Sequence, residues 1–419
     1  MSTRLTQTEG FRALASLSYR RFVAGYAFSS TASWMQRVCF GFLVWEMTHS
    51  TFWLGVISFA EFLPILLVSP LIGDAIDRRD KKNIIFWFEV LPAMAMLLLL
   101  LLLLLGALTL PLLFVIAFVL GTSMAVSHPA QLAWYPTLLK DRSHIGSAAN
   151  IYILSLNLAR FLGAGLAGAV ISFFGIEAAV ALTAVGYLIF VVVLTTIPQL
   201  DKTPVQTRRG NALSGAVAGM RYAASRRVLG MTLLIIAITS AGARGIPELA
   251  PALTERQLGL AAEWFSVLIA ATGLGSVIAG CWNLAARDQS MRTAIRQTVI
   301  FSLALAPCAV GIAFAETLWL AMLLFTALGF AITVTAVKSQ QVIQSLVDDS
   351  MRGRVNTLYF LSFRGGTAFG ALWMGTASSV IGLSMTLVIG GLLCAGAWWL
   401  TRDLADALIL PDIDEAKAQ

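Results

Sequence analysis

The sequence predicts an all-α integral membrane protein with twelve transmembrane helices in two parallel, pseudo-symmetric halves of six. Three observations carry this prediction: the composition, the distribution of basic residues and an internal repeat. The 419 residues are 58% hydrophobic and 12% charged, whereas soluble domains carry about 25% charged residues. So little charge excludes a soluble enzyme, a secreted disulfide scaffold, a collagen and a disordered chain, and it leaves an integral membrane protein.

Twelve apolar stretches have the length of a transmembrane helix. Each holds about 19–28 residues, enough to cross a hydrocarbon core about 30 Å thick with some tilt. They lie at 22–46, 52–72, 83–105, 110–132, 146–172, 177–197, 228–252, 264–285, 294–314, 317–338, 355–380 and 383–401. Residues 1–21 are polar and basic without the apolar core of a signal peptide, so we expect the first span to be retained.

The basic residues divide sharply between the two sides of these spans. Twenty-three of the 29 lysines and arginines fall on one side, Arg256 falls on the other, and five lie inside spans. The positive-inside rule places the basic side in the cytoplasm, so both termini are expected there. The net charge of +7 then reflects loops facing anionic lipid and does not indicate nucleic acid.

The chain also repeats with an offset of 207 residues. This offset places Gly73 on Gly280, Tyr152 on Tyr359, Leu154 on Leu361, Ser155 on Ser362, Gly163 on Gly370, Gly168 on Gly375 and Gly175 on Gly382. Six spans per repeat make the halves parallel, which is typical of a transporter with a central site. We predict an N-terminal half at 1–197, a cytoplasmic linker at 198–227, a C-terminal half at 228–401 and a cytoplasmic tail at 402–419.

The loop after the second span has the sequence G-D-A-I-D-R-R-D-K-K, from Gly73 to Lys82. A glycine lets a helix end pack closely, and Asp77 can cap a neighbouring helix and meet the positive end of its dipole. We predict a cytoplasmic gate formed by Gly73, Asp77, Arg78, Lys81 and Lys82. The alternative is that the basic residues only set the topology.

This loop resembles the G-x-x-x-D-R-x-G-R-R motif of the major facilitator superfamily, with Asp80 in place of a glycine. Three further stretches resemble a branch that contains enterobactin exporters and transmembrane secretion effectors. They are Trp34-Met35-Gln36, the segment from His128-Pro129-Ala130 to Arg160, and the segment from Ser345 to Val355. The resemblance implies the major facilitator fold, transport of a small molecule by alternating access, a bacterial inner membrane location and a monomer.

The fifth span carries a glycine-rich stretch from Ala159 to Gly168 that is similar to a motif of drug/proton antiporters. Ala164 stands where that motif has proline, which weakens an inference of antiport. Gly163, Gly165 and Gly168 are also explained by close helix packing, since small residues let membrane helices approach.

Eight ionisable residues lie within the spans, where each costs at least about 2.5–3.5 kcal/mol at a helix centre and therefore marks a functional site by default. They are Arg37, Glu61, Glu89, Arg160, Arg244, Glu248, Lys338 and Arg364. Five basic groups against three acidic ones favour an anionic substrate, because the arginine fork matches carboxylate and phosphate. We predict substrate binding by Arg37, Arg160, Arg244 and Arg364, with Trp34 and His128.

Glu61 and Glu248 are the predicted proton-coupling residues. Glu61 has apolar neighbours and is expected to resist ionisation unless a cation approaches. Arg37 and Arg160 are its candidate partners, and protonation of Glu61 would release an arginine to bind substrate. The alternative is a permanent structural salt bridge. Glu248 lies one helical turn from Arg244, so these two could also form a self-contained pair.

Two other charges have structural interpretations. Glu89 lies in the third span, on the outside of the resembled fold, and could pair with Arg78 or Lys82. Lys338 lies near the cytoplasmic end of its span and could extend its ammonium group to the interface.

No nucleotide-binding motif, metal-ligand pattern or enzyme motif occurs in the sequence, so we expect neither a cofactor nor a metal. The leading prediction is a proton-coupled exporter of an amphiphilic, anionic metabolite such as a siderophore, with drugs as further cargo. The alternatives are a proton-coupled uptake symporter for a small organic anion and a transporter-like subunit that acts as a sensor or partner. The expected partners are a small-molecule substrate, protons and the bilayer.

Overall fold

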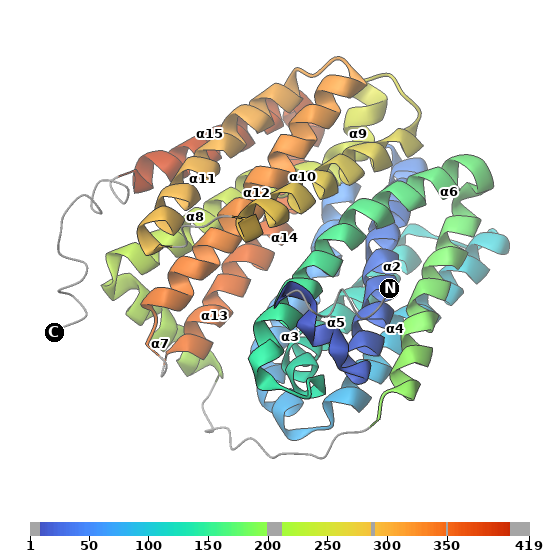
Figure 1. Ribbon diagram of the computed structural model, residues 1–419. Helices are drawn as coiled ribbons and strands as arrows, with labels where there is room; N and C mark the ends of the chain where they lie inside the picture. Colours follow the sequence, from blue (N-terminus) through green and yellow to red (C-terminus); the bar gives the residue numbers. More distant parts are fainter. Residues whose placement is uncertain (1–8, 199–211, 286–289, 349–350, 403–419) are drawn as a thin grey trace. The chain divides into compact units, whose positions relative to one another are not determined.

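A computed structural model describes residues 9–198, 212–285, 290–348 and 351–402, and within these ranges the side chains of residues 9–11, 69–78, 142, 212–217 and 284 lie outside the described part. Within these ranges every regular element is a helix (Figure 1). The chain divides into two compact units. Unit 1 comprises Met1–His49, Ala60–Arg209 and Ala261–Gly273, and unit 2 comprises Ser50–Phe59, Gly210–Leu260 and Leu274–Gln419.

Unit 1 is built from long helices joined by short loops. They are α2 (Leu17–Thr48), α3 (Thr51–Arg78, which begins in unit 2), α4 (Lys81–Leu104), α5 (Leu110–Trp134) and α6 (Ile145–Thr196). Short helices η1 (Glu9–Ala15), η2 (Tyr135–Leu138), η3 (Arg142–His144) and η6 (Ala262–Trp264) complete the unit. Helix α6 packs against both α2 and α4, and α4 also packs against α5. Their shared interior holds the buried polar groups described below.

Unit 2 is also built from helices, but short 3-10 and π-helical segments interrupt several of them. Its helices are α7 (Ala212–Ser225), α8 (Arg227–Ala243), α9 (Ala250–Ala252), α10 (Phe265–Ala285, which begins in unit 1), α11 (Met291–Ala313), α12 (Leu318–Leu346), α13 (Arg352–Phe360), α14 (Gly366–Ile381) and α15 (Leu383–Thr401). Three short elements break the long ones: the 3-10 helix η4 (Ile246–Leu249) and the π-helices η5 (Leu253–Gln257) and η7 (Leu361–Gly365). Helix α11 packs against both α12 and α15, and all three helices pack against α8.

Nine stretches of the described chain are long and apolar enough to cross a membrane. This number takes α6 as one stretch although it covers two predicted spans, and it includes neither α2 nor the interrupted α13–α14. The helical membrane fold is therefore confirmed, and the count of twelve spans stays a prediction. Exposed apolar side chains such as Trp87 and Leu98 of α4 suit a lipid-facing surface.

Two glycines related by the 207-residue repeat make the same turn. Gly175 has φ 84° and ψ 171° inside α6, and Gly382 has φ 84° and ψ 162° between α14 and α15. A positive φ is strained for residues with a Cβ atom, so glycine is required at both places. These turns lie between the predicted fifth and sixth spans and between the predicted eleventh and twelfth spans.

A second pair of repeat-related glycines lets helices approach closely. A Cβ atom on Gly163 would lie 2.5 Å from the carbonyl oxygen of Thr31, and one on Gly370 would lie 2.9 Å from that of Ala241. Gly165, in contrast, has its nearest neighbour 4.0 Å away, at the Cβ atom of Ala270. Packing thus explains Gly163 but places no such demand on Gly165.

Candidate functional site

Two arginines of unit 1 flank one tryptophan ring. The guanidinium carbon of Arg37 lies 5.1 Å from the ring centroid of Trp34, and that of Arg160 lies 4.5 Å from the same centroid. Helix α2 carries Trp34 and Arg37 three residues apart, on one face, and α6 supplies Arg160 beside the close contact at Gly163. The geometry therefore brings together three of the predicted substrate-binding residues.

Arg37 also forms an ion pair. Its Nε lies 3.6 Å from Oε2 of Glu61, with 18% and 12% of the two side chains exposed. Gln36 donates from Nε2 to Glu61 Oε1 at 3.5 Å, and the hydroxyl of Tyr187 donates to Gln36 Oε1 at 2.7 Å. Arg37, one of the two partners predicted for Glu61, thus meets its carboxylate in this structure.

Unit 2 contains a second pair of arginines around an aromatic ring. The guanidinium carbons of Arg244 and Arg364 lie 3.9 Å and 5.7 Å from the ring centroid of Phe363. Arg244 also donates from Nη2 to the carbonyl of Ile332 at 3.2 Å. Phe363 and Arg364 belong to the π-helix η7, and π-turns inside α-helices are frequent at functional sites.

Arg37 and Arg244 occupy matching positions of the repeat. They are 207 residues apart, and the residues one turn before them, Trp34 and Ala241, contact the repeat-related Gly163 and Gly370. The sequence comparison of the two halves contained this relationship but did not single it out. In the described part of the chain, Arg37 pairs with a carboxylate, whereas the partners of Arg244 are a carbonyl and an aromatic ring.

Glu248 does not form the pair with Arg244 that their spacing allowed. Ser58 Oγ donates to Glu248 Oε2 at 2.9 Å, and the Arg244 guanidinium turns to Ile332 instead. The physical reason is that the helix ends at Ala243 and Glu248 lies in the 3-10 helix η4, so the regular α-helical spacing behind the expectation is lost.

Glu89 and Lys338 also differ from their sequence interpretations. Glu89 is 4% exposed and hydrogen bonded to neutral groups, and Lys82 donates from Nζ to the carbonyl of Ile197 at 2.6 Å. The other predicted partner of Glu89, Arg78, has its side chain outside the described residues. Lys338 is 2% exposed, with Nζ 3.4 Å from Gln341 Oε1. Its ammonium group is thus enclosed by protein and does not extend to the interface.

The predicted gate is described in part. The side chains of Gly73, Asp77 and Arg78 lie outside the described residues, so the gate stays a prediction there. Asp80, which departs from the family motif, accepts the backbone N–H of Lys82 at 3.0 Å and caps the start of α4. Lys81 is the first residue of that helix.

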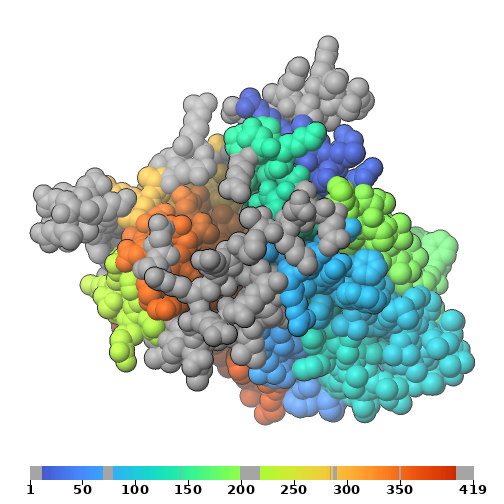
Figure 2. All heavy atoms as spheres, turned by 90° about the horizontal axis from the view of Figure 1, so that it is seen from below, coloured from blue at the N-terminus to red at the C-terminus, as the bar shows by residue number. Residues whose placement is uncertain are grey.

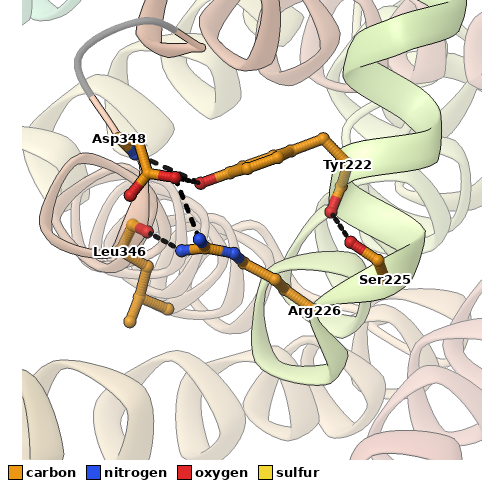
Figure 3. A network of polar contacts seen from close by, with 5 residues as sticks. All are labelled: Tyr222, Ser225, Arg226, Leu346 and Asp348. Atoms are coloured by element: carbon orange, nitrogen blue, oxygen red, sulfur yellow. Dashed lines mark hydrogen bonds and ion pairs between the residues drawn. The ribbon is translucent and has the colours of Figure 1, made fainter. Parts of the chain in front are cut away.

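A polar network at the start of α8 was not predicted (Figure 3). Arg226 donates to Asp348 Oδ2 at 2.9 Å and to the Leu346 carbonyl at 3.0 Å, and the Tyr222 hydroxyl donates to Asp348 Oδ2 at 2.8 Å. The network holds the amphipathic helix α7 beside the ends of α12 and α13, where yellow-green and orange residues adjoin in Figure 2. The weakly amphipathic sequence of the linker at 211–225 was the available signal.

His128, the remaining predicted site residue, lies against an aromatic group. Its ring centroid is 6.3 Å from that of Tyr152, and the side chain is half-buried. Within the described ranges no group of three or more histidine, cysteine, aspartate or glutamate side chains is placed to hold a metal ion.

The model of the transmembrane secretion effector family matches residues 8–416, which is nearly the whole chain. The chain belongs to this family of the major facilitator superfamily. It is therefore a multi-pass membrane transporter and not an enzyme. This finding confirms the resemblance seen in the gate loop and in the three further stretches.

Curated relatives are similar over most of their length. A staphyloferrin A transporter of Staphylococcus aureus is 22% identical, with 88% of this chain and 92% of the relative covered. An enterobactin exporter of Salmonella typhi is 26% identical, with 83% and 86% covered. Both relatives are siderophore transporters.

Solved structures support the fold. The nucleoside transporter NupG superposes with a TM-score of 0.72 at 9% identity, covering 92% of this chain and 98% of NupG. A bacterial homolog of the lysosomal transporter Spinster superposes with a TM-score of 0.71 at 13% identity, covering 92% and 97%. At such identities these likenesses show the major facilitator fold.

Proposed function

We propose that the transporter is a proton-coupled exporter of an amphiphilic, anionic small molecule of the siderophore kind, working by alternating access. The observation that carries the proposal is the environment of Arg244. Its cationic group is half-buried at membrane depth, and its partners among the described residues are neutral. A buried charge needs a counter-charge, and an anionic substrate would supply it.

The surroundings of Arg244 suit an amphiphilic anion. A guanidinium presents a planar fork of donors that matches a carboxylate or phosphate. Arg364 adds a second positive charge on the same ring of Phe363, and the ring offers an apolar face to the rest of the molecule. The names of the curated relatives, which refer to siderophores, agree with a substrate of this kind.

Coupling to protons is assigned to Glu61, with Glu248 as a second carboxyl. The proposal rests on the Arg37–Glu61 ion pair at 3.6 Å. Protonation of Glu61 removes its negative charge, so Arg37 can bind an anion beside Trp34 and the neighbouring Arg160. Deprotonation attracts Arg37 back and displaces the anion. We propose in addition that both termini are cytoplasmic, that the membrane is the bacterial inner membrane and that the protein is a monomer.

Transport by reconstituted protein tests this function. Proteoliposomes are loaded with a carboxylated siderophore and given a pH gradient of either direction, with a lipophilic cation as the comparison cargo. A proton-coupled exporter should move the siderophore in the direction opposite to the flow of protons, and a protonophore should abolish this movement. Movement with the proton flow would identify an uptake symporter. Failure of any solute to move would support the sensor or partner role and contradict the proposal.

A further inference from the structure

Glu89 occupies a buried polar cradle inside unit 1. The side chain extends from α4 and is 4% exposed. Ser29 of α2 donates to Oε2 at 2.7 Å, and Ser127 and Gln131 of α5 donate to Oε1 at 2.8 Å and 2.9 Å. Gln131 also donates to Ser127 Oγ at 2.8 Å. Three helices thus converge on one carboxyl group.

Among the described residues, the side chains that bond to this carboxyl are neutral and lie beside aromatic rings. Tyr152 of α6 donates to Gln131 Oε1 at 3.4 Å, and its ring stacks on that of Tyr26 of α2 at 4.3 Å. Tyr187 of α6 also lies within electrostatic range of Glu89, and His128 of α5 packs on Tyr152. In the described part of the chain, the hydrogen-bond partners of Glu89 are two hydroxyls and an amide.

The ion pair of Arg37 and Glu61 is separated from Glu89 by the neutral side chains of Gln36 and Tyr187. Tyr187 bonds to Gln36, and Gln36 bonds to Glu61, which is the partner of Arg37. The Glu61 carboxylate is therefore compensated by a guanidinium, whereas Glu89 is compensated by dipoles. A proton that arrives at Glu61 must compete with Arg37, but a proton that arrives at Glu89 meets hydroxyl and amide groups.

The cradle can satisfy both protonation states of Glu89. Burying an ionised carboxylate costs several kcal/mol, which hydrogen bonds from neutral donors offset in part. A hydroxyl both donates and accepts, so Ser29 or Ser127 can accept a hydrogen bond from the protonated acid. The freed serine hydrogen can then bond to the carbonyl four residues earlier, as Ser155 does with Ile151 at 2.8 Å.

We infer that Glu89 is a proton-binding site of the transporter, separate from Glu61. One proton delivered by water adds to a carboxylate oxygen and forms the acid, and the reverse step returns the proton to water. Proton binding at Glu89 changes the hydrogen bonds that join α2, α4 and α5, so it alters the packing of unit 1. This inference does not depend on the identity of the substrate.

Infrared difference spectroscopy tests the inference without any substrate. The full-length protein in lipid nanodiscs is titrated from acidic to alkaline buffer, and the carbonyl stretch of a protonated, non-hydrated carboxyl is followed. We expect a titrating band that is lost in Glu89→Gln and retained in Glu61→Gln. An unchanged band in Glu89→Gln, or the absence of a titrating band in the wild type, would overturn the inference.

A second variant keeps the test decisive if Glu89→Gln fails to fold. Ser127→Ala keeps the carboxyl but removes one donor to the carboxylate, so the midpoint of the band should move to higher pH by about one unit. If the titration midpoint of the band in Ser127→Ala equals that of the wild type, the hydrogen bond from Ser127 does not influence proton binding, which contradicts the inference. In proteoliposomes, Glu89→Gln should weaken the dependence of transport on the pH gradient, which Glu61 still supports, while substrate exchange continues. If no anion is carried, the proposed function fails, but the infrared result still decides the assignment of Glu89.

Discussion

Arg37 and Arg244 stand at equivalent positions of the two halves, and within the described structure Arg37 alone of the two faces a carboxylate. Arg37 lies 3.6 Å from Glu61, while Arg244 contacts the Ile332 carbonyl and the Phe363 ring. The two arginines related by the repeat therefore have different environments. Arg37, which is paired with Glu61, suits the proton-dependent release of an anion. Arg244, whose described partners are neutral, suits constant attraction of an anion.

The ion pair of Arg37 and Glu61 should stabilise the protein. Glu61→Gln leaves a largely buried guanidinium without its counter-charge, and we expect a loss of about 1–3 kcal/mol, since both side chains keep some exposure. Thermal unfolding in detergent measures the effect.

A double-mutant cycle separates this pair from general damage. Arg37→Gln combined with Glu61→Gln removes both charges, so the double variant should lose less than the sum of the single variants. Strict additivity would show that the two side chains do not interact.

Gly163 should tolerate no larger residue, whereas Gly165 should. Gly163→Ala places a Cβ atom 2.5 Å from the Thr31 carbonyl and 2.8 Å from the Cβ of Trp34, while the same change at Gly165 meets nothing closer than 4.0 Å. Overpacking of this kind costs about 1–3 kcal/mol. Melting temperatures of the two variants provide the comparison, and equal values would contradict the packing described for α2 and α6.

Asp80 should contribute to the start of α4 as its N-cap. Asp80→Ala removes the acceptor of the Lys82 N–H and should cost about 1 kcal/mol, whereas Asp80→Gly, the residue of the family motif, should cost a few tenths. Amide hydrogen exchange over the first turn of α4 measures both. Equal protection in all three proteins would mean that the aspartate has another role.

The network of Arg226 and Asp348 should hold α7 in place. The pair is exposed, 45% and 57%, so Asp348→Asn should change global stability by less than about 1 kcal/mol. Local exchange at Met220–Ser225 should nevertheless rise, because the Tyr222 and Arg226 contacts weaken together. The matched control is Glu316→Gln, which lies away from α7. Unchanged exchange in Asp348→Asn would show that apolar contacts alone seat the helix.

Sequence reasoning predicted the helical membrane fold because apolar length and basic asymmetry are properties of single segments. The repeat also aligned Gly175 with Gly382 between predicted spans, and the structure shows a positive φ at both glycines. The contacts between side chains of different helices could not be predicted from the sequence. Glu89 lies among Ser29, Ser127 and Gln131, and contacts between distant helices leave no local pattern in the sequence.

Local departures from regular helix account for the remaining differences. The expected pairing of Arg244 with Glu248 assumed an unbroken α-helix, but α8 ends at Ala243. The π-turn that positions Phe363 and Arg364 has no distinctive residue pattern. The linker helix α7 was visible as a weakly amphipathic stretch, yet its docking depends on Asp348, more than a hundred residues later in the chain.

Ligand-dependent thermal stability tests the central claim, that the site takes anions through Arg244. Purified protein is melted with a set of carboxylated, siderophore-like anions and with a set of lipophilic cations, because a ligand that binds the folded state raises its apparent stability. We predict stabilisation by anions, reduced at least about tenfold in apparent affinity by Arg244→Ala and unaffected by Arg221→Ala at an exposed site. Stabilisation by cations alone, or by anions equally in wild type and Arg244→Ala, would contradict the account.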